Sequence, residues 1–160
     1  MELDQYQVAI IGLGMMGRRM ASNMAAHHKF NIYAGWDPNP AACAQARIEH
    51  PEIWIGETAQ DIIGDSQTDL VYVASPPLSH EPHAMAAINA GKAIFCEKPL
   101  GIDVALSRAL VEMAEERGLA NAINFPFAAS PAVSFIKDQL DVKGAGNIIG
   151  ADVQLHFSQW

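Results

Sequence analysis

Residues 8–17 read VAIIGLGMMG, an apolar run that passes directly into the glycine pattern G-x-G-x-x-G. The three glycines are Gly12, Gly14 and Gly17, and a helical stretch follows at Met15–His27. In such a unit the first glycine turns the chain, the second lets the backbone approach a pyrophosphate, and the third lets the helix pack on the strand. The pyrophosphate then lies over free N–H groups at the positive end of the helix. The sequence therefore predicts a dinucleotide-binding βαβ unit.

An acidic residue stands at the end of the second apolar segment. Asp37 follows Gly17 by 20 residues, a spacing at which an acid accepts hydrogen bonds from the adenosine ribose of NAD. Its charge would repel the 2′-phosphate of NADP, and Pro38-Asn39-Pro40 offers no Arg or Lys to hold that phosphate. We therefore expect NAD as the cofactor, bound by Asp37 and by the glycine turn together with Met15 and Met16 at the helix start.

Apolar segments alternate with helical patterns along the chain, which indicates parallel βαβ units with right-handed crossovers. Strands are expected at about Gln7–Ile11, Asn31–Trp36, Ile53–Ile55, Leu70–Ala74, Ala93–Cys96 and Ala120–Ile123. Helices are expected at about Met15–His27, Pro40–Glu49, Ala59–Ile63, His80–Ala90 and Val104–Arg117. Asp103 fits the N-cap of the last helix, and Gly91 and Gly118 fit helix ends. The expected fold class is α/β, a doubly wound parallel Rossmann sheet over residues 1–124.

The pattern changes after the sixth strand. The loop 126–130 leads into a helix that starts at Pro131 and runs to about Leu140. Residues 151–158, ADVQLHFS, alternate between apolar and polar, which is typical of a half-buried strand in an antiparallel sheet. We therefore expect residues 125–160 to be a linker helix and the first strand of a truncated second α/β domain. Because the apolar face of that strand needs a partner, a homo-oligomer is expected.

Composition narrows the possible partners. Half of the residues are hydrophobic and 18% are charged, which is typical of a globular protein. The net charge is −8, with Lys and Arg scattered singly, so neither a nucleic acid nor an anionic membrane is an expected partner. No apolar run reaches membrane-spanning length and Met1–Gln5 lacks the features of a signal peptide, so a cytoplasmic protein is expected. Cys43 and Cys96 form no C-x-x-C pattern and are interpreted as structural thiols.

Metal and hydrolase chemistry have little support in the sequence. His80 and His83 are three residues apart near a helix start, but no third ligand stands at a suitable spacing. Packing at the helix start is the simpler interpretation, and no metal site is expected. No serine lies in a G-x-S-x-G pattern, so a hydrolase is not indicated.

Polar residues also follow two later strands. Ser75 comes after the fourth strand, and Glu97-Lys98 ends the fifth. In a doubly wound sheet ligands bind beyond the carboxyl ends of the strands, so these residues share an edge with the glycine turn. A lysine there could donate a proton to a substrate hydroxyl or carbonyl. The alternative, which spacing alone favours, is a solvated lysine that pairs with Glu97.

Several stretches together resemble the N-terminal half of the glucose-fructose oxidoreductase, inositol dehydrogenase and rhizopine-catabolism (Gfo/Idh/MocA) family. They are the glycine turn, Ala74-Ser75-Pro76 with His80, Ala90-Gly91-Lys92 with FCEKPL at 95–100, and Ser130-Pro131-Ala132-Val133. The resemblance covers almost the whole chain, and Glu97-Lys98-Pro99 is its most specific element. It implies a Rossmann domain and a second α/β domain with a large antiparallel sheet. It also implies a nicotinamide-dependent enzyme that oxidises or reduces sugars, polyols or related carbonyl compounds as its small-molecule substrate.

The resemblance also implies roles for individual residues. Lys98 matches the catalytic lysine, which contacts the substrate, and Asn124 matches a position near the substrate. Glu97 matches an acid on the ribose and nicotinamide side of the cofactor. The remaining cofactor-binding residues that it implies are Ser75, Pro76 and His80.

Some features depart from the family pattern. Members often carry Asn at the position of Pro77 and Arg at that of Pro126. The family's catalytic Asp and His belong to the second domain, beyond Trp160, so the 160-residue chain alone is not expected to turn over a substrate. The alternatives are a cofactor-sensing regulator and a free-standing binding module on the same fold. Lys98 and Glu97 favour the enzyme, because a sensor needs only the cofactor-binding residues.

Overall fold

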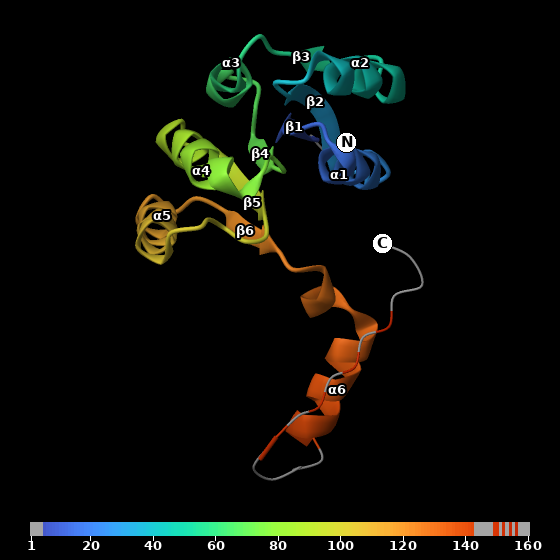
Figure 1. The fold of residues 1–160 in the computed structure, drawn as a ribbon, viewed down its shortest axis with the longest axis vertical. Coiled ribbons are helices and arrows are strands. Elements are labelled where there is room, and N and C mark those ends of the chain that lie inside the picture. The colour runs from blue at the N-terminus through green and yellow to red at the C-terminus, as the bar shows by residue number, and fades with distance from the viewer. Residues whose placement is uncertain (1–4, 143–148, 151, 153, 155, 157–160) are drawn as a thin grey trace. The chain divides into compact units, whose positions relative to one another are not determined.

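The computed structural model describes residues 5–142, 149, 150, 152, 154 and 156 (Figure 1). They belong to two compact units, of which the first ends at Asn124 and the second begins at Phe125. The strands of the first unit are β1 Tyr6–Ile11, β2 Phe30–Trp36, β3 Trp54–Ile55, β4 Leu70–Val73, β5 Ala93–Glu97 and β6 Asn121–Asn124. Its helices are α1 Met15–Ala25, α2 Pro40–Glu49, α3 Ala59–Gly64, the 3₁₀ turn η1 Pro77–Ser79, α4 His80–Asn89 and α5 Val104–Glu116.

The six strands form one parallel sheet in the order β3-β2-β1-β4-β5-β6. The chain first builds outward from β1 to β3 and then returns to add β4 on the other side of β1. The order therefore reverses between β1 and β4, the place where ligands bind in doubly wound sheets. The Rossmann fold expected from the sequence is confirmed, with every strand boundary within one residue of its expected position.

Helices cover both faces of this sheet (Figure 1). Each face has its own hydrophobic core. On one face α3, α4 and α5 pack on inward residues such as Val71 and Val73 of β4. On the other face α1 and α2 pack on Val8, Ile10 and Tyr72. Successive strand residues point to opposite faces, so a parallel strand covered on both sides is apolar throughout, as the VAII run of β1 is.

Local signals in the sequence fix the helix ends. The Asp103 carboxylate accepts hydrogen bonds from the backbone N–H groups of Ala105 and Leu106, which caps α5. Gly91 and Gly118 have φ values of 71° and 64° after α4 and α5, a conformation that favours glycine at a helix end. These expectations are confirmed.

The second unit contains the 3₁₀ helix η2 Pro126–Ala129 and the helix α6 Pro131–Val142. The sequence predicted a loop at 126–130, and this is wrong because the fixed φ of Pro126 starts a helical turn. The strand expected at 151–158 lies largely outside the described residues. The assignment of 125–160 to a second domain stays a prediction. No helix in the described part of the chain is long and apolar enough to cross a membrane.

Candidate functional site

The glycine turn between β1 and α1 is held by close backbone contacts. Gly12 has a φ of 92°, and a Cβ built on it would lie 2.6 Å from the backbone nitrogen of Ser75. A Cβ on Gly17 would overlap the carbonyl oxygen of Gly12. Two of the three glycines are therefore required by the fold itself, because no side chain fits at either position.

Gly14 differs from the other two glycines. It is the N-cap of α1, with φ −66° and ψ −168°, a conformation that any residue adopts. Apart from Gly14 itself and its two chain neighbours, no heavy atom of the described residues lies within 4 Å of a Cβ built there. Nothing in the fold requires a glycine at this position, and the open space leaves room for a ligand to approach the backbone.

The start of α1 provides groups that suit an anion. Its N-cap makes no side-chain hydrogen bond, and its first turn contains no acidic residue. The first N–H groups of a helix have no partner within the helix, and its N-terminus carries partial positive charge. Met15 and Met16, expected at the cofactor, form this first turn and are exposed. This arrangement fits the pyrophosphate of a dinucleotide.

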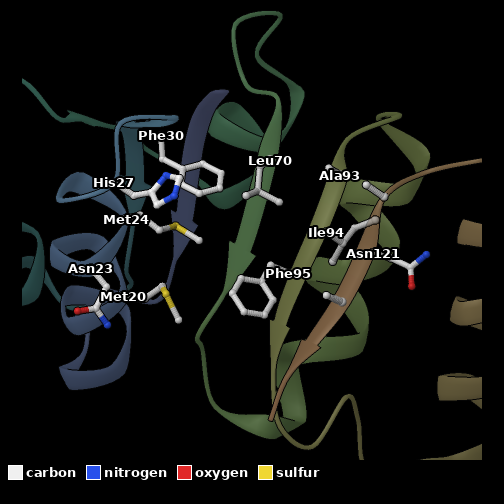
Figure 2. Close-up of a pocket in the computed structure, with 12 residues that line it drawn as sticks. Met20, Asn23, Met24, His27, Phe30, Leu70, Ala93, Ile94, Phe95 and Asn121 are labelled. Carbon is white, nitrogen blue, oxygen red and sulfur yellow. The ribbon is translucent and has the colours of Figure 1, made fainter. Parts of the chain in front are cut away.

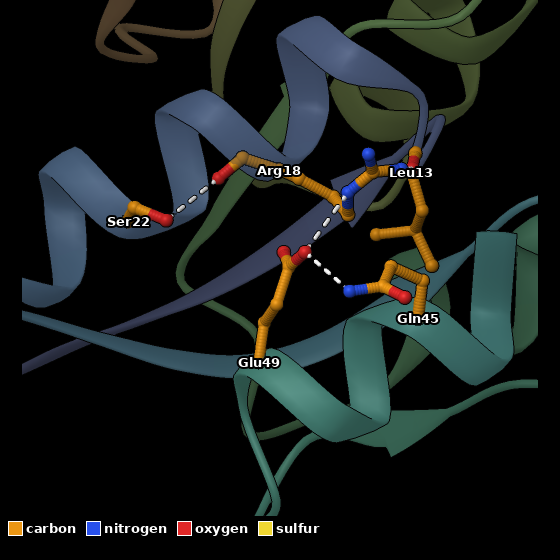
Figure 3. A network of polar contacts seen from close by, with 5 residues as sticks. All are labelled: Leu13, Arg18, Ser22, Gln45 and Glu49. Carbon is orange, nitrogen blue, oxygen red and sulfur yellow. Dashed lines mark hydrogen bonds and ion pairs between the residues drawn. The ribbon is translucent and has the colours of Figure 1, made fainter.

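The peptide of Leu13, inside the glycine turn, is held from both sides. Its N–H donates to Asp37 Oδ2 at 2.8 Å, and its carbonyl oxygen accepts from Arg18 Nη1 at 2.9 Å. Figure 3 shows Arg18 reaching across to α2, where its Nε lies 3.3 Å from Glu49 Oε1. Gln45 donates to the same carboxylate oxygen at 2.8 Å. Sequence analysis missed Arg18, although a basic residue directly after the third glycine was a usable signal.

Asp37 has a structural role at the end of β2. Besides the Leu13 contact, its Oδ1 accepts from the Asn39 N–H at 2.8 Å. The side chain is half-buried. A carboxylate has about four acceptor positions, so Asp37 keeps the capacity to accept from ribose hydroxyls.

His80 lies in the interior, behind the loop that follows β4. Its side chain is 1% exposed, with Nδ1 2.7 Å from the Pro99 carbonyl oxygen and Nε2 2.6 Å from the Ser75 carbonyl oxygen. Carbonyl oxygens only accept, so both contacts are hydrogen bonds only when each ring nitrogen carries a proton. Sequence analysis placed His80 among the cofactor-binding residues. Both ring nitrogens face backbone carbonyl oxygens, so His80 links two loops of the site, and its contact with the cofactor stays a prediction.

The described structure shows neither a metal site at His83 nor a reactive thiol at the two cysteines. The described residues contain no group of three His, Cys, Asp or Glu side chains that could hold a metal ion. Burial lowers the pKa of His83, and nearby His80 lowers it further. Cys43 and Cys96 are buried and free. Burial, with a smaller contribution from Glu97, raises the pKa of the Cys96 thiol to about 12, which leaves it protonated and unreactive.

Glu97 and Lys98 lie in different surroundings although they are neighbours in sequence. Glu97 is buried, and its Oε1 accepts from the Tyr72 hydroxyl at 2.6 Å and from Asn124 Nδ2 at 2.7 Å. Lys98 is exposed, and the salt bridge found among the described residues joins Arg18 and Glu49 instead. Lys98 is therefore not held by an ion pair with Glu97 in this structure.

These contacts connect the residues at the carboxyl ends of the strands. Gly12 packs on Ser75, and His80 joins Ser75 to Pro99, next to Lys98. Glu97 then pairs across the sheet with Asn124 of β6. Pro76 lies exposed in the same loop as Ser75. The predicted residues thus share the edge formed by the carboxyl ends of the strands, which runs from the reversal of strand order between β1 and β4 across to β6.

An apolar groove of about 450 Å³ lies elsewhere. Figure 2 shows it on the α1 face, near the amino ends of the strands. The residues that line it include Met20, Met24, Phe30, Leu70 and Phe95. Because ligands of doubly wound sheets bind at the carboxyl ends, this groove is not the expected cofactor site.

Comparison with known proteins identifies the family. Residues 6–125 match the Gfo/Idh/MocA model, described as an oxidoreductase family with an NAD-binding Rossmann fold. The chain belongs to this family. The resemblance inferred from the sequence and the expected NAD-binding fold are thereby confirmed.

Individual relatives agree with this assignment. An inositol 2-dehydrogenase from Paracoccus denitrificans is 30% identical over 156 residues, which cover 94% of this chain and 44% of the relative. A levoglucosan dehydrogenase from Pseudarthrobacter phenanthrenivorans is 28% identical, and the match covers 92% of this chain and 40% of the relative. The crystal structure of GenD2 from gentamicin A biosynthesis, in complex with NAD, matches with a TM-score of 0.84 at 25% identity. The match covers 91% of this chain and 41% of the GenD2 chain. The chain spans less than half of the length of these relatives.

The glycines allow binding and folding to be separated by experiment. Gly14→Ala is expected to leave the melting temperature within a few degrees of the unmodified chain, because the new methyl group meets no protein atom. It should weaken NADH binding about ten-fold or more, because the methyl group occupies the approach to the helix start. Gly17→Ala, the matched variant, should lower the melting temperature strongly because its methyl group overlaps the Gly12 carbonyl. Unchanged NADH affinity in Gly14→Ala would rule out this binding position.

Proposed function

We propose that this chain is the cofactor-binding part of a nicotinamide-dependent oxidoreductase that acts on a sugar, polyol or related carbonyl compound. The observation that carries the proposal is the exposed Lys98, which lies beside buried Glu97 on the same sheet edge as the glycine turn. A cofactor-sensing protein needs the glycine turn and Asp37 but has no use for a lysine at this place. The substrate class is supported by the inositol and levoglucosan dehydrogenases among the relatives.

The cofactor-binding residues have separate tasks in this proposal. The helix start at Gly14, Met15 and Met16 holds the pyrophosphate with backbone N–H groups. Asp37 accepts hydrogen bonds from the hydroxyl groups of the adenosine ribose. Ser75 and Pro76 line the channel toward the nicotinamide. When bound, the nicotinamide ring supplies or accepts a hydride.

Lys98 acts on the substrate in this proposal. Its ammonium group donates a hydrogen bond to the substrate oxygen and polarises it while the hydride is transferred to or from the adjoining carbon. Glu97 and Asn124 stand beside it and orient hydroxyl groups of the cofactor and substrate. Lys98 is free to do this because no carboxylate of the described residues holds it in an ion pair.

We also propose a cytoplasmic location, without nucleic-acid or membrane partners. Two buried, free cysteines are typical of a reducing compartment. A net charge of −8 disfavours binding to polyanions.

The identity of the cofactor can be tested by titration. The chain should bind NADH about ten-fold or more tightly than NADPH, since a repulsion of about 1.4 kcal/mol between Asp37 and a 2′-phosphate corresponds to that ratio. NADH and NADPH fluorescence would measure both affinities. Because exposed charges are screened by salt, the ratio should narrow as ionic strength rises. Equal or tighter binding of NADPH would show that the assignment to NAD is wrong.

The role of Lys98 can be tested in a form of the protein that turns over substrate. Lys98→Ala should lower kcat by about 10²–10⁴-fold, the range for a positioned proton donor, and leave NADH affinity nearly unchanged. Lys29→Ala, which removes another exposed lysine, serves as the control and should leave both values unchanged. If Lys98→Ala keeps most of its turnover, the lysine has no catalytic role. An equal loss of cofactor binding would make it a cofactor contact.

Self-association is the last part of the proposal and rests on the sequence pattern of residues 151–158. An alternating strand with one apolar face pairs with another strand, so we expect two or more chains to associate through residues 148–160. Light scattering would compare the 160-residue chain with a chain that ends at Gly144. Association of the longer chain alone is the expected result. If both are monomeric at the same concentration, this segment does not mediate association.

A further inference from the structure

Tyr72 lies in the middle of the sheet, on the face that carries α1. It is completely buried, and its ring packs against Phe95 with the ring centroids 5.2 Å apart. In the register of the sheet Tyr72 stands opposite Phe95, so Glu97 is its diagonal neighbour on the same face. Side chains on the same face of neighbouring strands can reach such a diagonal partner. The Tyr72 side chain thus extends along this face of the sheet toward Glu97.

The hydroxyl of Tyr72 has one specific partner. It donates to Glu97 Oε1 at 2.6 Å, and Asn124 Nδ2 donates to the same oxygen at 2.7 Å. The other oxygen, Oε2, has only a long contact of 3.3 Å with the Lys98 N–H among the described residues. Burial first, and the Glu97 carboxylate second, raise the pKa of Tyr72, so the phenol stays protonated and remains the donor.

Packing alone does not explain a tyrosine here. A phenylalanine would fill the same space beside Phe95 without placing a polar oxygen in the core. A buried hydroxyl is tolerated when it has a partner, and here the partner is the acid of the proposed site. The two donors occupy one carboxylate oxygen and fix the orientation of the whole group.

We propose that Tyr72 is a positioning residue, which together with Asn124 holds Glu97 so that Oε2 accepts a hydrogen bond from a hydroxyl group on the nicotinamide half of the cofactor. This inference rests on the proposed function. Tyr72 lies in β4, outside both the glycine turn and the Glu97-Lys98-Pro99 motif. Tyr72 itself touches neither cofactor nor substrate and acts through Glu97.

The test compares Tyr72→Phe with the unmodified 160-residue chain, using NADH and ADP as two probes. ADP carries only the adenosine and pyrophosphate part, so its binding does not involve Glu97. Tyr72→Phe should weaken NADH about ten-fold, equivalent to one hydrogen bond to a charged group, and leave ADP unchanged. The matched control is Tyr33→Phe, which removes a phenol that donates to Asp65 at 3.3 Å in another part of the sheet, and it should change neither affinity.

A double-mutant cycle with Glu97→Gln separates positioning from general destabilisation. If Tyr72 acts through Glu97, Tyr72→Phe should have little further effect on NADH binding once Glu97→Gln is present. Thermal unfolding of each variant shows whether it is folded. Equal weakening of NADH and ADP, additive effects in the cycle, or unchanged NADH affinity in folded Tyr72→Phe would each overturn the inference. If the unmodified chain binds neither NADH nor ADP, the proposed function fails instead.

Discussion

The close approach of α1 to the end of β1 is the constraint on which the rest of the site depends. Helix α1 can start where it does only because Gly17 has no side chain and leaves room for the carbonyl of Gly12. Gly12 in turn lies against the backbone that leaves β4. The first helix and the fourth strand are thereby brought together at the reversal of strand order, which is where a doubly wound sheet binds its ligand.

Buried polar contacts extend this constraint along the edge of the sheet. Asp37 and Arg18 hold the Leu13 peptide, His80 joins the loops after β4 and β5, and Glu97 joins β5 to β6. A buried polar group is costly unless it has a partner, so these contacts favour one arrangement of the loops. The edge is therefore organised by the protein itself. Loops that are already ordered lose less conformational entropy when a cofactor binds.

The sequence predicted the fold and the location of the site because both depend on local patterns. Apolar runs, Asp103 and the glycines after α4 and α5 determine the element ends, and the glycine turn determines the edge. The partners of buried side chains depend on tertiary contacts. Tyr72 was not singled out within the strand expected at Leu70–Ala74, and the two carbonyl partners of His80 could not be read from the sequence. A tyrosine hydroxyl in an otherwise apolar, buried strand needs a hydrogen-bond partner, and this was the signal that could have identified Tyr72.

The same contacts explain why the acids of the site are poor probes of its function. Asp37 holds two backbone N–H groups, and Glu97 holds side chains from β4 and β6, so truncating either acid to alanine leaves donors without their partner. Any loss of binding in such a variant mixes the cofactor contact with damage to the loop that carries it. Gly14 and Lys98 have no comparable structural contacts. Changes at Gly14 and Lys98 therefore report on the ligand more directly than changes at the two acids.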